Sequence, residues 1–318
     1  MTGIRTMVVA GVAAAAVVTG FAGTASAAWE PKQPIQILVG FSPGGGTDII
    51  ARNIASAAQP FFPVPLVVVN KPGAAGSIAA ETVKNSKPDG YTLFVAGGSE
   101  SVSMGNHQKL GYDIRKDFTG VMQITRQRVA ITVNDSSPWK TVGDMVEAVK
   151  AAPGKYTFGS SGAGSTYHSI MLVLAHEAGL DMKHTPYQGG APSLAALLGG
   201  HIDVTPLAPE ESASVYEAGR IRYLALASDG RSPALPDVPT VQEEGYDVFV
   251  ENLKGFAGPA GMPDEVVAYL HDNFKKALES EAFKKLADKA NLELQYRNGE
   301  DFMGAITDMY NQIGTAVK

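Results

Sequence analysis

The 318-residue sequence contains no cysteine. A chain without thiols has no thiolate nucleophile, no cysteine-ligated zinc and no iron–sulfur cluster. Charged residues are also few, at 18%, and the 32 acidic side chains outnumber the 26 basic ones. This balance leaves no broad basic surface for a phosphate backbone or an anionic membrane, so we expect no nucleic-acid partner.

Sequence motifs of catalysis and nucleotide binding are missing too. No Gly-Lys-Ser/Thr loop occurs, and the six histidines lack the spacing of a zinc-protease motif. In the Gly-rich turn at residues 44–49, Ile49 stands where the Gly-x-Gly-x-x-Gly loop of a dinucleotide-binding protein has its third glycine. We therefore expect no catalytic residue, no cofactor and no metal site. An enzyme acting on a small organic acid remains the alternative, because missing motifs weaken that hypothesis without excluding it.

The first 27 residues have the pattern of an export signal. Arg5 provides the positive start, residues 7–22 are apolar or small, and residues 25–27 form the small-x-small sequence that signal peptidase accepts. A membrane anchor is the alternative, but the uninterrupted apolar stretch is shorter than the roughly 20 residues of a spanning helix. We therefore predict an exported protein that is cleaved near Ala27.

The remainder of the chain repeats a strand, a Gly-rich turn and a helix. Each unit has a short β-rich run, a turn of Gly, Ser and Pro, and a stretch with apolar residues three and four apart. Such units lie at residues 35–55, 66–84, 91–99, 156–177 and 185–198. Alternating strands and helices predict an α/β fold in which each domain is a mostly parallel sheet flanked by helices. The length of the mature chain predicts two domains.

Two segments are suited to cross between these domains. Residues 121–133 form a long β-capable run without a turn signal, and residues 248–255 follow a Pro-rich loop. We therefore predict a first domain of residues 28–126 plus 251–318, and a second domain of residues 127–250. The helical stretches near the C-terminus are expected to pack on the first domain.

The Gly-rich turns lie where an open α/β sheet binds ligands, at the carboxyl ends of its strands. Free N–H groups at a helix N-terminus form an anion site when glycines allow close approach. We expect the backbone of Gly44, Gly45, Gly46 and Thr47 to bind a carboxylate there, with Asp48 capping the helix. A tight turn without any ligand is the alternative interpretation.

A second loop rich in Gly and Ser, residues 159–165, precedes another helix. His168 lies in the first turn of that helix and is suited either to face an anion held by the loop or to cap and pack. Lys254 is a cation in an otherwise apolar and Gly-rich run, which makes it the basic residue best placed for a ligand.

Several longer motifs are distinctive when they are taken together. They are FSPGGGTD at residues 41–48, VNKPGAAG at 69–76, PDGYTL at 88–93, GSSGAGS at 159–165, PYQGG at 186–190, DVPT at 237–240 and GPAGMP at 258–263. With these motifs the chain resembles the periplasmic substrate-binding receptors of tripartite tricarboxylate transporters, also called the Bug family. The resemblance spans essentially the whole mature chain.

The resemblance implies a two-domain fold of the periplasmic-binding-protein type with a ligand cleft between the domains. It implies a monomeric periplasmic receptor for a small di- or tricarboxylate-like metabolite, which it delivers to membrane permease subunits. The ligand would be held by the loops at residues 41–48 and 160–168. The residues expected to bind it are Phe41, Pro43, Gly44, Gly45, Gly46, Thr47, Asp48, Gly73, Ser99, Ser160, Gly164, Ser165, Thr166, His168, Tyr187, Gly189, Asp203 and Lys254.

Overall fold

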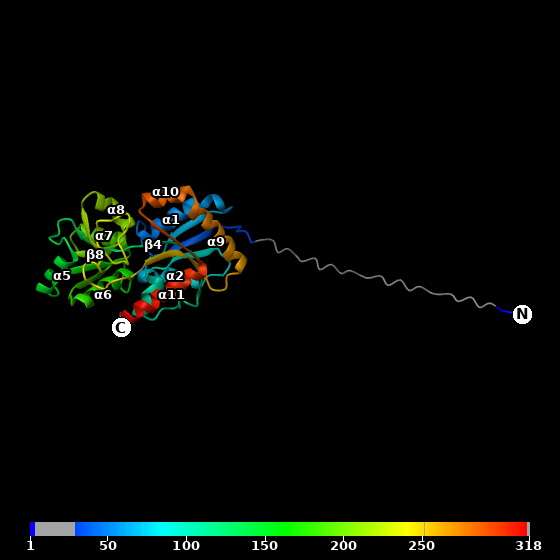
Figure 1. Cartoon of the computed structure of the whole chain (residues 1–318), viewed down its shortest axis with the longest axis horizontal. Helices are drawn as coiled ribbons and strands as arrows, with labels where there is room; N and C mark the ends of the chain where they lie inside the picture. The colour runs from blue at the N-terminus through cyan, green and yellow to red at the C-terminus, as the bar shows by residue number, and fades with distance from the viewer. Residues whose placement is uncertain (4–28, 251, 317–318) are drawn as a thin grey trace.

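The computed structural model of the chain describes residues 1–3, 29–250 and 252–316, and the predicted cleavage site near Ala27 lies outside these residues. The described chain forms two lobes side by side, each built on one β-sheet with helices on its faces (Figure 1). The helices labelled α5 to α8 cover the sheet of the second lobe, and the other labelled helices cover the sheet of the first lobe (Figure 1). The predicted α/β fold with two lobes is confirmed.

The first lobe contains a six-stranded sheet in the order β11-β4-β10-β3-β1-β2. Its strands are β1 (Ile35–Val39), β2 (Leu66–Asn70), β3 (Thr92–Ala96), β4 (Phe118–Gln127), β10 (Asn252–Pro259) and β11 (Glu293–Asn298). Its helices are α1 (Gly46–Ala58), α2 (Ser77–Lys84), α3 (Ser99–Val102), α4 (Met104–His107), α9 (Asp264–Glu279), α10 (Glu281–Lys289) and α11 (Gly299–Ala316), with short 3-10 turns at Gln59–Phe61 and Ala74–Gly76.

The second lobe contains a five-stranded sheet in the order β7-β6-β8-β5-β9. Its strands are β5 (Ala130–Asn134), β6 (Thr157–Ser160), β7 (Lys183–Pro186), β8 (Val204–Leu207) and β9 (Ile221–Leu226). Its helices are α5 (Val142–Ala151), α6 (Thr166–Ala178), α7 (Gly190–Leu198) and α8 (Pro209–Glu217).

Both sheets are mixed, so the prediction of mostly parallel sheets is wrong in this respect. β1 pairs in parallel with β2 and β3, and β6 pairs in parallel with β7 and β8. The strands that join the lobes are antiparallel to their neighbours: β10 to both β3 and β4, and β5 to both β8 and β9. The chain must leave the first sheet and return to it, and this reversal inserts antiparallel strands among the βα units.

The lobes are joined by strands β4, β5 and β10. Only Arg128 and Val129 separate β4 from β5, and the returning chain enters β10 at Asn252, which is paired with Gln127 of β4. The strands of the first sheet thus lie within residues 35–127 and 252–298, and those of the second within 130–226. The exact domain boundaries, at 126/127 and 250/251, stay a prediction.

The core of the first lobe explains how its C-terminal helices are fixed. Ile35 and Ile37 of β1 are fully buried, as expected for a central strand covered on both faces. They share one cluster with Phe274 of α9 and Phe283 of α10, which are also fully buried. These contacts hold α9 and α10 on the same side of the sheet as α1, as the sequence predicts.

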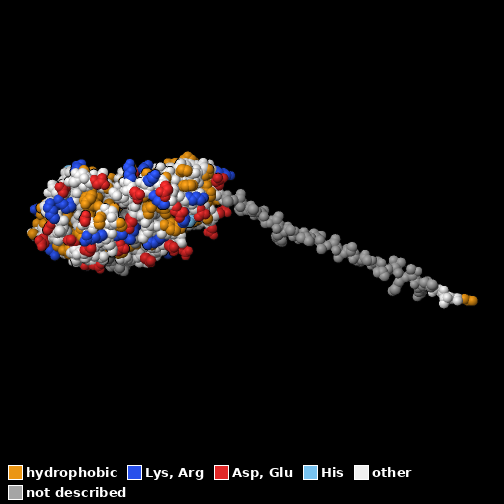
Figure 2. All heavy atoms as spheres, turned by 45° about the horizontal axis from the view of Figure 1, so that its top comes forward, with side chains coloured by type: hydrophobic (Ala, Val, Ile, Leu, Met, Phe, Trp, Pro, Cys, Tyr) orange, Lys and Arg blue, Asp and Glu red, His pale blue; other side chains and the backbone are white. Residues whose placement is uncertain are grey.

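Charged side chains of both signs lie on the exterior of the described chain (Figure 2). On the face shown in Figure 2, basic and acidic side chains are interspersed, and no large area of one sign is seen. No described helix combines the length and apolar character that a membrane span requires.

Candidate ligand-binding site

The first Gly-rich turn follows β1 and leads into α1. The helix begins at Gly46 with Gly45 as its N-cap, so Asp48, which was predicted to cap the helix, lies within its first turn. Asp48 nevertheless accepts a hydrogen bond from the Gly44 N–H at 3.0 Å and is paired with Arg52. Burial alone would raise the pKa of Asp48, but these hydrogen bonds hold the pKa below its ordinary value. Asp48 therefore stabilises the turn.

A small cavity lies between the two lobes at this turn. Its volume is about 20 Å³, room for about one water molecule, because the loops of the two lobes are in contact. The residues that line it are Phe41, Gly45, Gly46, Thr47, Ser99, Gln127, Ser161, Tyr167, Gly190, Glu211, Asn252 and Lys254.

Thr47 and Ser161 line this cavity from opposite lobes. Thr47 lies in the first turn of α1, and Ser161 directly follows β6. Thr47 is 8% exposed and Ser161 is 6% exposed. Among the residues that the structure describes, no hydrogen bond to either hydroxyl is found, and neither is one of the fully enclosed polar atoms that lack a partner. Both hydroxyls are therefore available to a ligand bound between the lobes.

The ammonium group of Lys254 reaches the same cavity from β10. Lys254 is 2% exposed, and its Nζ donates to Asn252 Oδ1 at 2.8 Å. Burial lowers the pKa of Lys254 more than the carboxyl groups around it raise that pKa. One cation thus lies between the lobes at the end of a strand that crosses between them.

Two adjacent glutamates lie at the start of α8, and of these Glu211 lines the cavity. Glu211 Oε2 accepts from the Gly46 N–H at 3.0 Å, while Oε1 accepts from the Tyr167 hydroxyl at 2.7 Å and the Ala208 N–H at 2.9 Å. Glu210 accepts from the Gln127 side chain. Burial raises the pKa of both glutamates, that of Glu210 to about 8, and the donors around Glu211 oppose the shift there.

Three of the four N–H groups predicted to bind a carboxylate, those of Gly44, Gly45 and Gly46, already have acceptors. Gly44 donates to Asp48, Gly45 to the Ser42 carbonyl at 3.4 Å, and Gly46 to Glu211. In this arrangement the Glu211 carboxylate occupies the position at the α1 N-terminus that the sequence analysis assigned to a ligand.

Three side chains in and between α3 and α4 bind the second lobe beside the cavity. Ser99 Oγ accepts from the Thr166 N–H at 2.9 Å, and Ser103 Oγ donates to the Gly164 carbonyl at 2.8 Å. His107 lies 3.0 Å from the Ser169 hydroxyl. Of the predicted residues Ser99, Gly164 and Thr166, only Ser99 lines the cavity, and all three hold the lobes together.

Ser160, Ser165 and His168 make contacts within the second lobe and do not line the cavity. Ser160 Oγ donates to the Gly162 carbonyl, and Ser165 Oγ caps α6 by accepting from the His168 N–H. His168 Nδ1 accepts from the Gly164 N–H at 3.0 Å, and its ring is stacked on those of Phe158 and His184. This geometry matches the capping and packing interpretation of His168.

Five other predicted residues lie around the cavity or away from it. Gly189 adopts φ 133°, and a Cβ there would lie 3.4 Å from the Ser42 nitrogen, so this glycine allows the lobes to approach. Asp203 accepts from both the backbone and the hydroxyl of Thr157. Pro43 is exposed, Tyr187 packs on the second-lobe core, and Gly73 contacts Ile78. Ligand contact by these residues stays a prediction.

Six residues that line the cavity are absent from the predicted set. They are Gln127, Ser161, Tyr167, Gly190, Glu211 and Asn252. Ser161 and Tyr167 lie within the predicted ligand loop at residues 160–168, and Gly190 ends the PYQGG motif, although none of the three was named as a binding residue. Glu211 gives a weaker signal: it is a polar residue four positions after the end of a buried strand.

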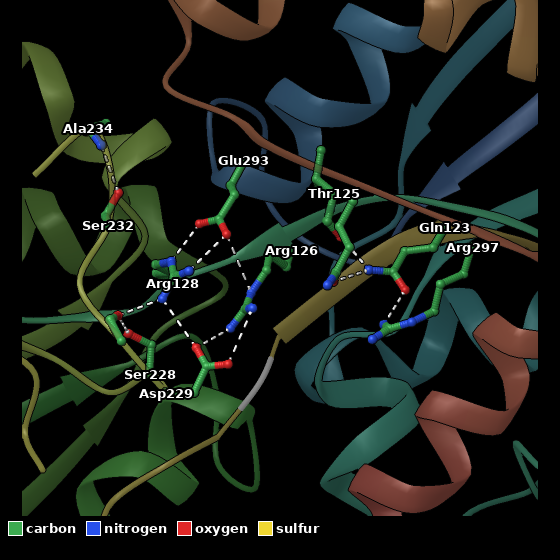
Figure 3. Close-up of polar contacts among 12 residues, drawn as sticks. Gln123, Thr125, Arg126, Arg128, Ser228, Asp229, Ser232, Ala234, Glu293 and Arg297 are labelled. Atoms are coloured by element: carbon green, nitrogen blue, oxygen red, sulfur yellow. Dashed lines mark hydrogen bonds and ion pairs between the residues drawn. The ribbon is translucent and has the colours of Figure 1, made fainter.

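A second cavity, of about 200 Å³, lies where the chain crosses between the lobes. Arg126 and Arg128 border it, and their guanidinium groups point toward Asp229 of the second lobe and Glu293 of the first (Figure 3). Arg128 donates to both carboxylate oxygens of Glu293, at 2.5 and 2.9 Å. Because the arginines are engaged with acidic partners, this cluster joins the lobes. In the part of the chain described here, no three His, Asp or Glu side chains are placed to hold a metal ion.

The two lobes, the crossing strands and the polar cavity between the lobes define a two-domain protein of the periplasmic-binding-protein type. Residues 50–318 match the family described as "Tripartite tricarboxylate transporter family receptor", and the chain belongs to this family of periplasmic receptors. The resemblance stated from the sequence is therefore confirmed.

Individual relatives agree over nearly the full length. The "UPF0065 protein in gbd 5'region" of Cupriavidus necator is 34% identical over 301 residues, which are 92% of this chain and 90% of the relative. A solved "Structure of a periplasmic transporter" has a TM-score of 0.86 and 32% identity, covering 90% of this chain and 97% of the other. MatC from Rhodopseudomonas palustris with bound malate has a TM-score of 0.85 and 26% identity, covering 91% and 100%.

Proposed function

We propose that this chain is a non-enzymatic periplasmic receptor that binds a small carboxylate between its two lobes and delivers it to permease subunits of a tripartite tricarboxylate transporter. The observation that carries the proposal is the convergence of Thr47, Ser161 and Lys254 on one cavity. Two hydroxyl donors and an ammonium match the hydrogen-bonding and charge requirements of a carboxylate.

Family membership supports the transport role, and MatC supports the ligand class. MatC is a structural neighbour whose structure holds malate, a small dicarboxylate. By analogy we propose a di- or tricarboxylate-like ligand for this chain. The monomeric state and the domains at residues 28–126 plus 251–318 and 127–250 belong to the same proposal.

Ligand access requires the lobes to separate. The cavity of about 20 Å³ is too small for a four-carbon acid, and contacts such as that between Gly46 and Glu211 close it. Strands β4 and β10 are where a hinge motion would act, because they carry the chain between the lobes. A ligand that contacts both lobes favours the closed form by its differential affinity.

Calorimetric titration of the mature protein with a panel of di- and tricarboxylates tests the proposal. We expect saturable one-to-one binding, and chromatography of the incubated mixtures should recover the acids unchanged. Thr47→Val and Ser161→Ala should each weaken binding about tenfold, as the loss of one hydrogen bond to a charged group predicts. Ser214→Ala on the exposed side of α8 is the matched control and should bind like the wild type.

The other outcomes identify the rival hypotheses. Conversion of an acid at an appreciable rate would indicate an enzyme of small organic acids. The absence of saturable binding to every acid would indicate a structural or adhesive protein.

A further inference from the structure

We propose that the ligand carries a cationic nitrogen in addition to its carboxylate, and that Glu211 is the acceptor that recognises this nitrogen. This inference rests on the proposed function, because it specifies the ligand class of the same cleft. The ligand would then be a zwitterion of the amino-acid type rather than a dianion.

The first argument is the charge between the lobes. One ammonium, on Lys254, lies among the carboxyl groups of Glu100, Glu210 and Glu211. Glu100 is 3% exposed and accepts from the Gly98 N–H and the Ser101 hydroxyl. Burial raises the pKa of all three carboxyl groups, that of Glu210 to about 8, so the surroundings of Lys254 already disfavour negative charge. A dianionic ligand would add two more negative charges to an enclosed space, whereas an ammonium group would offset one.

The second argument is the geometry of Glu211. Its carboxylate is fixed by three donors, from Gly46, Tyr167 and Ala208. A carboxylate offers about four acceptor positions, so one remains for a further donor. Glu211 lines the cavity, which places that position where a ligand binds.

The third argument is the division of the cavity into an anionic and a cationic part. Glu211 already accepts the Gly46 N–H, so that donor is taken. A ligand carboxylate is left with the hydroxyls of Thr47 and Ser161, which line the cavity, and with the ammonium of Lys254. The ligand thus meets donors on one side and a fixed carboxylate on the other.

Matched pairs of acids that differ only in an amino group test this inference. Calorimetry at neutral pH would compare succinate with aspartate, glutarate with glutamate, and adipate with 2-aminoadipate. We expect the amino acid of at least one pair to bind at least about tenfold more tightly than the acid without nitrogen. Glu211→Gln should reduce this ratio toward one or invert it, and Glu211→Asp, which keeps the charge, should retain a preference.

Controls separate recognition from folding. Glu217→Gln, on the exposed end of the same helix, should leave the ratio unchanged. Circular dichroism establishes whether Glu211→Gln is folded, and if it is not, the wild-type ratio and Glu211→Asp decide the question.

Two results would overturn the inference while leaving the proposed function intact. The first is tighter or equal binding of the nitrogen-free acids in every pair that binds. The second is an unchanged ratio in folded Glu211→Gln, which would make Glu211 only a helix cap. Failure of every acid to bind, with or without nitrogen, would instead overturn the proposed function itself.

Discussion

The imidazole rings of His168 and His184 are stacked with their centroids 3.9 Å apart and their planes 12° from parallel. The ring centroid of His107, in the first lobe, lies 5.9 Å from that of His168. Burial, together with the positive charges that His184 and His107 would carry, lowers the pKa of His168 to about 4. Burial lowers the pKa of His107 and of His184 as well. At neutral pH the three imidazoles of this cluster, through which His107 meets the second lobe, are therefore uncharged.

Acidification should destabilise the protein through this cluster. Between pH 4 and 6.5 the unfolded chain protonates His168 and the folded chain does not, so the free energy of unfolding falls as pH falls through this window. One such group contributes a slope of at most about 1.4 kcal/mol per pH unit. Urea denaturation at several pH values should show a smaller slope for His168→Gln than for the wild type. The exposed His201→Gln is the control, and parallel curves for His168→Gln and the wild type would refute the prediction.

Glu210 should have the opposite pH dependence. Its folded pKa of about 8 lies above the ordinary value of 4.5, so the folded state holds an extra proton between these values and loses stability as pH rises. Glu210→Gln keeps an acceptor for the Gln127 side chain and does not ionise. We expect the free energy of unfolding of the variant, relative to that of the wild type, to rise by about 1 kcal/mol per pH unit between pH 5 and 8. A difference in unfolding free energy that does not change with pH would contradict this assignment.

The two adjacent glycines at the start of α1 should respond differently to a methyl group. A Cβ at Gly46 would lie 2.6 Å from the Gln127 side-chain nitrogen, whereas at Gly45 the nearest neighbour is the Ser42 carbonyl at 3.5 Å. Gly46→Ala must displace Gln127 and should lower the free energy of unfolding by about 1 to 3 kcal/mol. It should also weaken ligand binding in calorimetry. Gly45→Ala is the matched control, and equal effects of the two changes would count against this packing.

The ion pair between Arg128 and Glu293 should be coupled more strongly than an exposed pair. Arg128 is 11% exposed at the side chain and makes two hydrogen bonds to Glu293. A double-mutant cycle of Arg128→Met and Glu293→Gln in urea should give a coupling energy of about 1 kcal/mol. The same cycle on Lys284 and Glu281, whose side chains are mostly exposed, should give a clearly smaller coupling. Similar coupling in the two cycles would show that the arginine cluster does not hold the lobes together.

Local sequence patterns were sufficient to predict most strands and helices of the fold. The run Ile35–Val39 followed by Pro and three Gly predicts a strand and a βα turn, and both are present. Local patterns did not predict which strands pair with each other or in which direction, because β10 lies between β3 and β4 but comes from far along the chain. Nothing in the sequence near Asn252 specifies that position.

The candidate site shows the same limit. The loop that contains Phe41 and Thr47 was recognisable from its glycines, since close backbone approach has a clear sequence signal. Glu211 was not recognisable, because its role depends on meeting Gly46 of the other lobe, 165 residues away. His168 was located correctly on its helix, but its stacking on His184 depends on side-chain directions that a sequence pattern does not determine.

The pairing of Gln127 with Asn252 also determines where the molecule can be divided by protein engineering. The chain leaves the first sheet and returns to it at two residues that face each other on neighbouring antiparallel strands, joined by a side-chain hydrogen bond of 2.7 Å. The second lobe is therefore an insertion whose two ends are adjacent, and a tight hairpin turn has the geometry to close the gap that its excision would leave. Lobes of related receptors would be exchangeable at this point without altering the order of strands in the remaining sheet.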